Sequence, residues 1–345
     1  MKKMLALLLA LVMVLSLAAC ASSQPAAAST ETAETTEAAE PAAEESAEAP
    51  AESGKTYTVG VCQLVQHEAL DAATQGFVDA LKEELGDAVT VDVQNASGDS
   101  VNCGTIVNGF VSKGVDLIMA NATPALTAAV SATADIPILG TSITAYGVAL
   151  DIDDFNGTVG GNVSGTSDLA DLQAQAQMIL DWFPETKTVG LLFCSAEPNS
   201  RYQIDEVRKA LEAQGVTCEE FAFTDSNDVS SVTQKAADFS DVVYIPTDNT
   251  AASNTEAIAN VLIPAGVPAV CGEEGLCRGC GVATLSISYY DLGVTTGKMA
   301  AKILNGEADI STMPVEYTDA TPKYNASVCE QLGITPLDGY EAIEG

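Results

Sequence analysis

The chain of 345 residues is long enough for two domains of ordinary size, and 47% of its residues are apolar. It carries 48 Asp and Glu against 14 Lys and Arg, which gives a formal net charge of −34. No stretch gathers the basic residues that neutralise phosphates, so the composition excludes a nucleic-acid binder and a protein held on anionic lipid by a basic patch. With one His and one Trp, the chain also has little material for His-based catalysis or for a metal site built from several His.

The first 20 residues have the pattern of an export signal. Two lysines precede an apolar run over residues 4–19, which ends in the sequence LAAC at Cys20. The run is too short for a comfortable membrane-spanning helix. A Cys directly after Leu-Ala-Ala resembles the bacterial lipobox, in which that Cys is lipidated and becomes the new N-terminus. We therefore expect lipid on Cys20 at the outer face of a Gram-positive-type cell membrane, with an ordinary cleaved signal as the alternative.

Residues 21–53 differ in composition from the rest of the chain. They are almost entirely Ala, Glu, Ser, Thr and Pro, with eight Glu and no Lys or Arg. Such a segment cannot bury enough apolar surface to offset its ordering entropy, so we expect a disordered acidic tether. The function is then expected in residues 54–345, outside the cytoplasm.

Strand patterns alternate with helical patterns in the first half of this region. We expect strands over residues 56–65, 89–93, 116–120 and 136–139. The spacing of apolar residues predicts helices over 69–85, 101–111 and 124–133. Strands separated by helices indicate βαβ units and a parallel sheet.

The same order recurs in the second half. We expect strands over 188–194, 217–223, 241–245 and 267–270, and helices over 200–214, 229–239 and 249–265. Similar short strings begin at positions 58 and 188, at 116 and 241, and at 136 and 267. Nearly equal separations in the same order favour an internal duplication, with chance matching of short apolar strings as the alternative. Two similar lobes side by side would form a cleft.

The last part of the sequence predicts how the lobes are joined. A strand over 282–288, a helix over 289–305 and a strand over 313–317 follow the second lobe, and the glycines at 160, 161 and 165 predict a flexible break. We expect the chain to cross near 162–166, 284–288 and 312–318. The expected fold is α/β, with two Rossmann-like parallel-sheet lobes joined by three hinge crossings. Lobe 1 would comprise 54–162 and 287–313, and lobe 2 would comprise 163–286 and 314–345.

Polar residues follow the predicted strands at their carboxyl ends, where ligands bind in open parallel sheets. In the first lobe Thr123 is placed as a helix N-cap before Pro124, which suits a carboxylate. In the second lobe Asp248 and Glu273 suit an ammonium group. The internal alignment pairs Thr123 with Asp248 across the cleft, which predicts a zwitterionic α-amino acid as ligand. For each residue taken alone, capping or turn chemistry is the alternative.

Several longer strings carry a family resemblance. They are VCQLVQHEALDAATQGF (61–77), ATPA (122–125), NVSGTSD (162–168), IPTDN (245–249) and ISYYDLGVTTGKMAAKILNGE (287–307). Together they resemble substrate-binding proteins of ABC importers of the tryptophan/tyrosine type, over residues 56–335. The resemblance implies a type I periplasmic-binding fold, an aromatic amino acid as ligand, and an ABC permease with its ATPase as partners.

Motif matching adds contacts from the second lobe and from the loop after the first strand. The expected ligand-binding residues are Gln63, Leu64, His67, Thr123, Pro124, Thr141, Thr144, Ser167, Ser195, Asn199, Ser200, Asp248, Glu273 and Tyr289. Two departures from the family pattern lie near the expected cleft. The sequence GEEG (272–275) stands where Gly-Asp-Glu-Gly is frequent, and TSIT (141–144) stands where Asp-Pro is common.

Other readings of the sequence stay open. Cys62 and Cys194 occupy near-equivalent places in the two lobes, which is the layout of cofactor-independent amino-acid racemases. A receptor that presents its ligand to a signalling partner would need the same closing cleft. The C-x5-C-x-x-C pattern over 271–280 has no fourth ligand nearby, so a local disulfide or free thiols are favoured over zinc. We expect a monomeric binding protein that is not an enzyme, with no catalytic residues, metal or cofactor.

Overall fold

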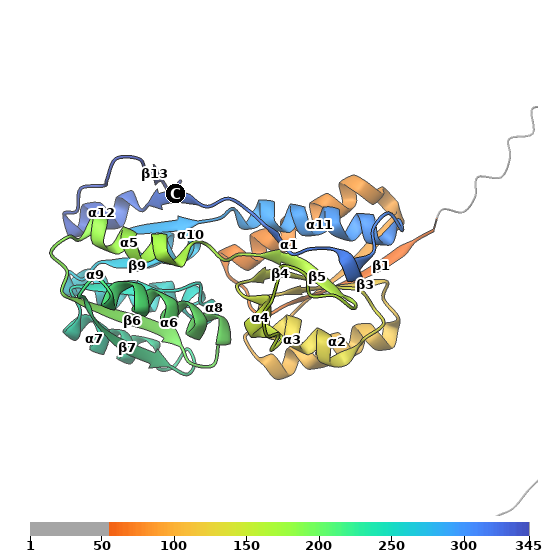
Figure 1. Cartoon of the computed structure of the whole chain (residues 1–345), viewed down its shortest axis with the longest axis horizontal. Helices are drawn as coiled ribbons and strands as arrows, with labels where there is room; N and C mark the ends of the chain where they lie inside the picture. The colour runs from red at the N-terminus through yellow and green to blue at the C-terminus, as the bar shows by residue number, and fades with distance from the viewer. Residues whose placement is uncertain (1–54, 345) are drawn as a thin grey trace, which may run out of the picture. The chain divides into compact units, whose positions relative to one another are not determined.

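The computed structural model describes residues 55–344, so the expected export signal, tether and Cys20 lie outside the described residues. Two α/β lobes lie side by side, each with helices on both faces of a central sheet (Figure 1). The chain passes between them three times, at residues 168–171, 287–288 and 318–320. This confirms the predicted fold class of two parallel-sheet lobes joined by three crossings.

The first lobe is built on a six-stranded parallel sheet with the order β11-β5-β4-β3-β1-β2. Its strands are β1 (Tyr57–Gln63), β2 (Val89–Asn95), β3 (Leu117–Asn121), β4 (Ile138–Ile143), β5 (Val163–Ser167) and β11 (Glu316–Tyr317). Every residue of the central strand β3 is buried, because helices cover both faces of a parallel sheet.

Helices α1 and α11 cover one face of this sheet, and α2 and α3 cover the other. The helices are α1 (Glu68–Leu85), α2 (Ser100–Lys113), α3 (Thr123–Ala132), α4 (Tyr146–Ala149) and α11 (Tyr289–Leu304), with 3-10 turns at Gly86–Ala88 and Ile310–Thr312. Two glycines let α1 and α11 approach closely. A Cβ at Gly76 would lie 2.1 Å from the carbonyl oxygen of Tyr290, and one at Gly293 would lie 2.0 Å from that of Ala73. This contact makes α11 part of the first lobe, although it follows the second lobe in the chain.

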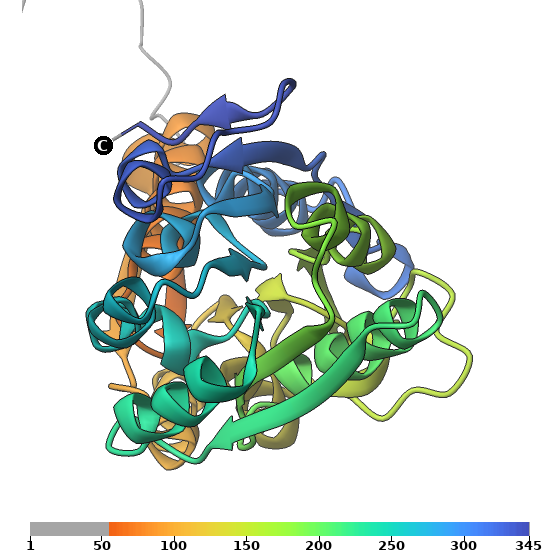
Figure 2. The same cartoon turned by 90° about the vertical axis from the view of Figure 1, so that its left-hand side faces the viewer.

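The second lobe has a seven-stranded sheet with the order β13-β12-β10-β9-β8-β6-β7, parallel except where β10 pairs with β12. Its strands are β6 (Thr188–Cys194), β7 (Thr217–Phe223), β8 (Val242–Ile245), β9 (Ala269–Cys271), β10 (Ala283–Ser286), β12 (Thr321–Tyr324) and β13 (Glu341–Ala342). Its helices are α5 (Leu172–Trp182), α6 (Pro198–Glu212), α7 (Val229–Phe239), α8 (Asn249–Ala252), α9 (Thr255–Ala265), α10 (Glu274–Cys280) and α12 (Ala326–Leu332), which surround the sheet in Figure 2.

The two sheets support the predicted duplication. In the first lobe the strands lie in the order β4-β3-β1-β2, and in the second the corresponding strands lie in the order β9-β8-β6-β7. The carboxyl ends of β1, β3 and β4 therefore have counterparts at the ends of β6, β8 and β9. None of the helices within residues 55–344 is both long and apolar enough to cross a membrane.

The structure differs from the sequence-based prediction near the hinge. Residues 163–167 and 316–317, which we expected in the second lobe, form β5 and β11 of the first-lobe sheet. Gly165 was expected in a flexible break but lies inside β5, where a Cβ would come within 2.0 Å of the carbonyl oxygen of Gly140. The glycine therefore permits close strand pairing. Two helices, α8 and α9, replace the single helix expected over 249–265. Ser253 caps the end of α8 and Asn254 the start of α9.

Candidate functional site

A narrow cavity with about 10 Å³ of open space lies between the lobes, at the carboxyl ends of the parallel strands. The residues that line it from the first lobe and its hinge are His67, Leu70, Ser142, Thr144, Asp168 and Tyr289. Those from the second lobe are Asn199, Thr247, Asp248, Asn249, Ala252 and Glu273. Most of these residues are polar and both lobes contribute them, so a ligand held here would contact both lobes. The space takes about one water molecule, so a larger ligand requires the lobes to move apart.

Four buried polar atoms of these lining residues have no hydrogen-bond partner among the described residues. They are His67 Nδ1, Ser142 Oγ, Asp168 Oδ1 and Asn199 Oδ1. Buried polar atoms are satisfied in the great majority of native structures, because an unpaired one loses its hydration without compensation. The clustering of four such atoms around one cavity marks a place where water or a ligand supplies their partners.

Three carboxyl groups line the cavity, and only one of them has an unused oxygen. Asp168 Oδ2 accepts a hydrogen bond from the Tyr289 hydroxyl at 2.9 Å, while its Oδ1 has no partner. Asp248 accepts from the backbone N–H of Ala251 at 2.8 Å and from that of Cys194 at 2.6 Å. No Lys or Arg is among the described residues that line the cavity. The cavity is therefore acidic, and its free carboxylate oxygen belongs to Asp168.

Glu273, like Asp248, uses both of its carboxylate oxygens for backbone N–H groups. Its two oxygens accept from the backbone N–H groups of Leu276 and Gly275 at 2.5 and 2.6 Å, so it caps α10. Burial raises the pKa of Glu273 to about 7 and, together with the charge of Glu197, that of Asp248 to about 8. Burial also raises the pKa of Asp168 above its usual value. A positive charge in the cavity would favour the ionised form of all three groups.

Two residues that follow or end first-lobe strands have unusual backbone conformations. Ala122, between β3 and α3, has φ of 91°, and Ser142, near the end of β4, has φ of 56°. At Ser142 the pairing of β4 with β5 shifts by a bulge. Strain of this kind is concentrated at binding sites, and here it accompanies the unpaired Ser142 hydroxyl in the cavity wall.

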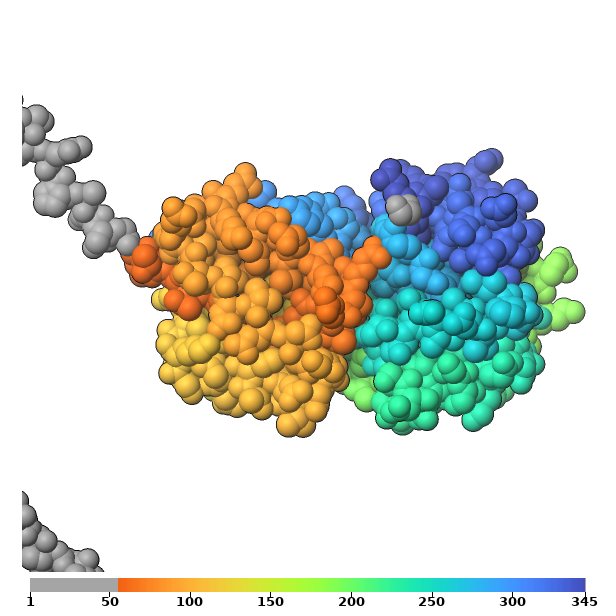
Figure 3. All heavy atoms as spheres, turned by 180° about the vertical axis from the view of Figure 1, so that it is seen from behind, coloured from red at the N-terminus to blue at the C-terminus, as the bar shows by residue number. Residues whose placement is uncertain are grey.

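Two interactions join the lobes beside the cavity. His67 Nε2 lies 3.3 Å from Asn249 Oδ1, across the cleft. Arg278 of α10 places its Nε 3.0 Å from both carboxylate oxygens of Glu68 at the start of α1. The space-filling view in Figure 3 shows the lobes meeting along a seam on this side. Polar contacts therefore bridge the cleft in this structure.

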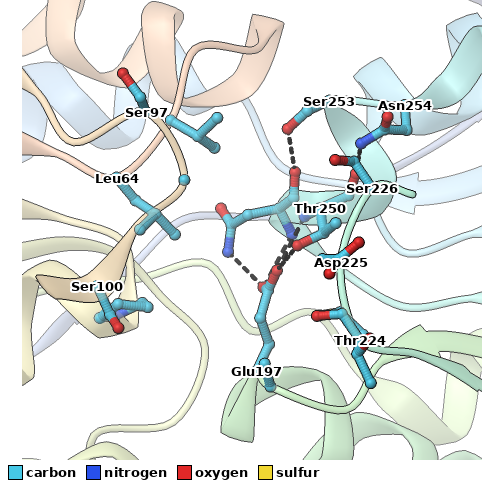
Figure 4. A pocket seen from close by; sticks show the side chains of 16 residues that line it. Leu64, Ser97, Ser100, Glu197, Thr224, Asp225, Ser226, Thr250, Ser253 and Asn254 are labelled. Carbon is cyan, nitrogen blue, oxygen red and sulfur yellow. Dashed lines mark hydrogen bonds between the residues drawn. The ribbon is translucent and has the colours of Figure 1, made fainter. Parts of the chain in front are cut away.

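A second, outer cavity of about 250 Å³ lies beside the first (Figure 4). Leu64, Ser97 and Ser100 face it from the first lobe, opposite Glu197 and Thr250 of the second. The buried Glu197 was not predicted from the sequence, although it organises this region. Its carboxylate accepts from the backbone N–H and side-chain Nδ2 of Asn249 at 3.0 and 2.7 Å, and from the N–H and hydroxyl of Thr250 at 2.9 and 2.8 Å.

The residues expected from the sequence fall into two groups. Those that line the inner cavity are His67, Thr144, Asn199, Asp248, Glu273 and Tyr289, while Leu64 and Pro124 line the outer one. The remaining ones lie outside both linings, where most make hydrogen bonds within the lobes: Gln63, Thr123, Thr141, Ser167, Ser195 and Ser200. The expected ligand contacts did not include Ser142, Asp168, Thr247 or Asn249. All four nevertheless lie in strings noted above: Ser142 in TSIT, Asp168 in NVSGTSD, and Thr247 and Asn249 in IPTDN.

The predicted pairing of Thr123 with Asp248 is not seen around the inner cavity. Asp248 lines it, but Thr123, the first residue of α3, does not. Both oxygens of Asp248 are already bonded to backbone N–H groups. The structure therefore favours Asp168 over Asp248 as the group with an oxygen available to a ligand.

The two-cysteine layout does not form at the cleft. Cys62 is fully buried in the first-lobe core with Cys103, whereas Cys194 lies at the end of β6 and lines the outer cavity. Burial raises the pKa of the Cys194 thiol to about 11, so it is protonated at neutral pH. The two thiols do not face a common ligand, and Cys271, Cys277 and Cys280 are buried thiols of the second-lobe core.

Comparisons with known proteins extend these findings. A tyrosine-binding protein of Clostridioides difficile (strain R20291) is 32% identical over 276 residues, which cover 78% of this chain and 79% of the relative. The structure of an ABC domain in complex with L-Trp from Streptococcus pneumonia is 32% identical, with a TM-score of 0.79, over 84% of this chain and all of that one. A ligand-free, open structure of a substrate-binding protein with adhesive properties from Clostridium difficile is 33% identical, with a TM-score of 0.64, over 84% of this chain and 99% of that one.

At nearly equal sequence identity, the backbone of the chain is more similar to that of the L-Trp complex, with a TM-score of 0.79, than to that of the open structure, with a TM-score of 0.64. This agrees with the polar contacts that bridge the cleft. The family model for ABC transporter substrate binding proteins matches residues 58–339, which include both lobes and all three crossings. The chain therefore belongs to the family of ABC transporter substrate-binding proteins.

Proposed function

We propose that the chain binds an α-amino acid with an aromatic side chain in the inner cavity, as a monomer and without turning it over, and delivers it to an ABC permease and its ATPase. The observation that carries the ligand class is the buried, unpaired oxygen of Asp168 in an acidic cavity without Lys or Arg. An ammonium group is the ligand feature that such an oxygen favours. The tyrosine-binding relative and the L-Trp complex support an aromatic amino acid.

The carboxylate of the ligand needs neutral donors, since no cationic side chain lines the cavity. Ser142 Oγ is unpaired there, and Thr144 lies beside it. This arrangement keeps the carboxylate on the first-lobe wall and the ammonium at the hinge.

The test is a thermal-shift screen of the purified protein against the twenty amino acids, followed by titration calorimetry and recovery of the ligand. An aromatic amino acid at 100 times its Kd should stabilise the protein by about 2.7 kcal/mol and be recovered unchanged. Absence of a shift with every amino acid, or recovery of a racemised ligand, would contradict the proposal.

We also propose that the protein is anchored by lipid on Cys20, with the folded part held away from the membrane. Cys20→Ser should release the protein into the medium, because a Ser cannot be lipidated at that position. Ligand affinity should be unchanged, since the cavity is built from residues 67–289. Fractionation of cells and medium measures the release, and a Ser variant that is processed normally but stays in the membrane fraction would contradict the anchor.

A further inference from the structure

The orientation of the Asn249 amide determines which His67 nitrogen carries the proton. Asn249 Nδ2 donates to a carboxylate oxygen of Glu197 at 2.7 Å, so the amide oxygen is the atom that faces His67. An amide oxygen only accepts, so the His67 Nε2 at 3.3 Å must donate. Amide and ring assignments follow from such networks, and this one leaves a single consistent choice.

The second ring nitrogen of His67 is therefore a hydrogen-bond acceptor. Burial lowers the pKa of His67, although the carboxylates of Glu197 and Asp71 act in the opposite direction, so the ring is neutral near pH 7. A neutral ring protonated at Nε2 has a lone pair at Nδ1. This atom is buried, has no partner among the described residues and belongs to a residue that lines the inner cavity.

Asn199 is fixed in the same way. Its Nδ2 donates to Glu197 Oε2 at 3.3 Å and to the carbonyl oxygen of Thr247 at 3.2 Å, which leaves Oδ1 as an unpaired acceptor. With Asp168 Oδ1, three of the four unpaired atoms around the cavity are then acceptors, and Ser142 Oγ alone can also donate. The complementary ligand carries more hydrogen-bond donors than acceptors.

The acceptors come from different elements. Asp168 begins the first hinge crossing and accepts from the Tyr289 hydroxyl, whereas His67 precedes α1 and faces Asn249 across the cleft. If the ammonium of the ligand binds at Asp168 and its carboxylate at Ser142, the group left for His67 is the ligand side chain.

We propose that His67 Nδ1 accepts a hydrogen bond from a donor on the ligand side chain, so that the cavity selects a phenol- or indole-bearing amino acid over its donor-free counterpart. This inference rests on the proposed function. It makes His67 a specificity-determining residue, which also bridges the lobes through its other nitrogen. A donor-free side chain would leave the buried Nδ1 unpaired, and sites built to bond a substrate donor reject such analogues by ~100-fold or more.

The test compares matched ligand pairs by titration calorimetry on the full protein. Tyrosine is paired with phenylalanine, and tryptophan with 3-benzothienylalanine, which keeps the bicyclic shape but lacks the N–H. We expect the donor-bearing member of the pair that binds best to bind at least ~100-fold more tightly than its partner. If both members of each pair bind equally well, the inference is wrong while the proposed function stands. If no aromatic amino acid binds, the proposed function itself fails.

Two variants separate the acceptor from the bridge. His67→Phe keeps an aromatic ring but removes both nitrogens, and it should reduce the discrimination within the pair to less than ~10-fold. Arg278→Gln weakens the contact with Glu68 across the cleft, together with contacts to Glu274 and Glu344 of the second lobe. It leaves His67 in place, so it should lower the affinity for both ligands equally and leave their ratio unchanged. Discrimination that persists in His67→Phe would overturn the role of His67. Because the wild-type ratio is measured first, the inference remains testable if His67→Phe folds poorly.

Discussion

Replacing Asp168 by asparagine should weaken amino-acid binding by ~100-fold or more, because removing one partner of a desolvated charge pair costs about 2–5 kcal/mol. Asparagine has nearly the same shape, and its carbonyl oxygen can still accept from the Tyr289 hydroxyl. The ligand-free protein should melt at the same temperature or higher, since a buried carboxyl group with an unpaired oxygen is itself unfavourable. Calorimetry measures the affinity, and a melting curve measures the stability.

Asp248→Asn is the matched control, because Asp248 lines the same cavity but uses both oxygens for backbone N–H groups. An asparagine there would place its own N–H₂ against one of these donors, so the ligand-free protein should melt at a lower temperature. Its affinity for the ligand should change far less than in Asp168→Asn. If instead Asp248→Asn loses affinity and Asp168→Asn does not, the ammonium binds at Asp248, as the sequence alone suggested.

The parts of the fold that depend on local patterns could be predicted from the sequence. The strands from β1 to β4 and from β6 to β9 are apolar runs separated by helical patterns, and their repetition predicted two lobes. The strand β5 could not be predicted in this way, because VSGTS contains one large apolar residue and three hydroxyl side chains. Its place in the sheet depends on the close approach of Gly165 to Gly140, which is a tertiary contact.

The sequence placed the candidate site at the cleft in which the inner cavity lies, but it did not give the same set of lining residues. The rule that ligands bind at the carboxyl ends of parallel strands located the cleft. It could not distinguish Asp248, whose oxygens are used within its own lobe, from Asp168, whose partner Tyr289 is 121 residues away in the sequence. Nor could it predict Glu197, because the contact of Glu197 with the start of α8 depends on how α6 and α8 lie together.

Affinity for a zwitterionic amino acid should rise as the pH is raised from 5 to 8. Burial raises the pKa of Asp168, and it raises those of Glu273 and Asp248 to about 7 and about 8, so the empty cavity holds protons in this range. The ammonium of the ligand requires an ionised carboxylate, so binding must release a proton wherever Asp168 is protonated in the free protein. The affinity then rises by up to tenfold per pH unit at pH values below the pKa of Asp168 in the free protein.

His67 changes the affinity in the same direction. Burial lowers its pKa, so its ring is neutral at the upper end of the range, and protonation at low pH removes the Nδ1 lone pair that accepts from the ligand side chain. Asp168→Asn separates the two contributions, because it removes the carboxyl group and leaves the imidazole. The pH dependence should become shallower in this variant, and an unchanged slope would assign the effect to His67 or to the other carboxyl groups.

The stability of the ligand-free protein should follow the opposite trend. A carboxyl group whose pKa is raised by folding contributes stability below its unfolded pKa of roughly 4, and this contribution is lost as the pH rises through the folded value. For Glu273 and Asp248 that loss extends to pH values of about 7 and about 8. The melting temperature of the empty protein should therefore fall between pH 5 and 8 while the shift caused by the ligand grows. Calorimetry in buffers of different ionisation enthalpy measures the released proton directly. If the binding enthalpy at pH 6 does not depend on the buffer, the carboxyl groups are already ionised in the empty cavity.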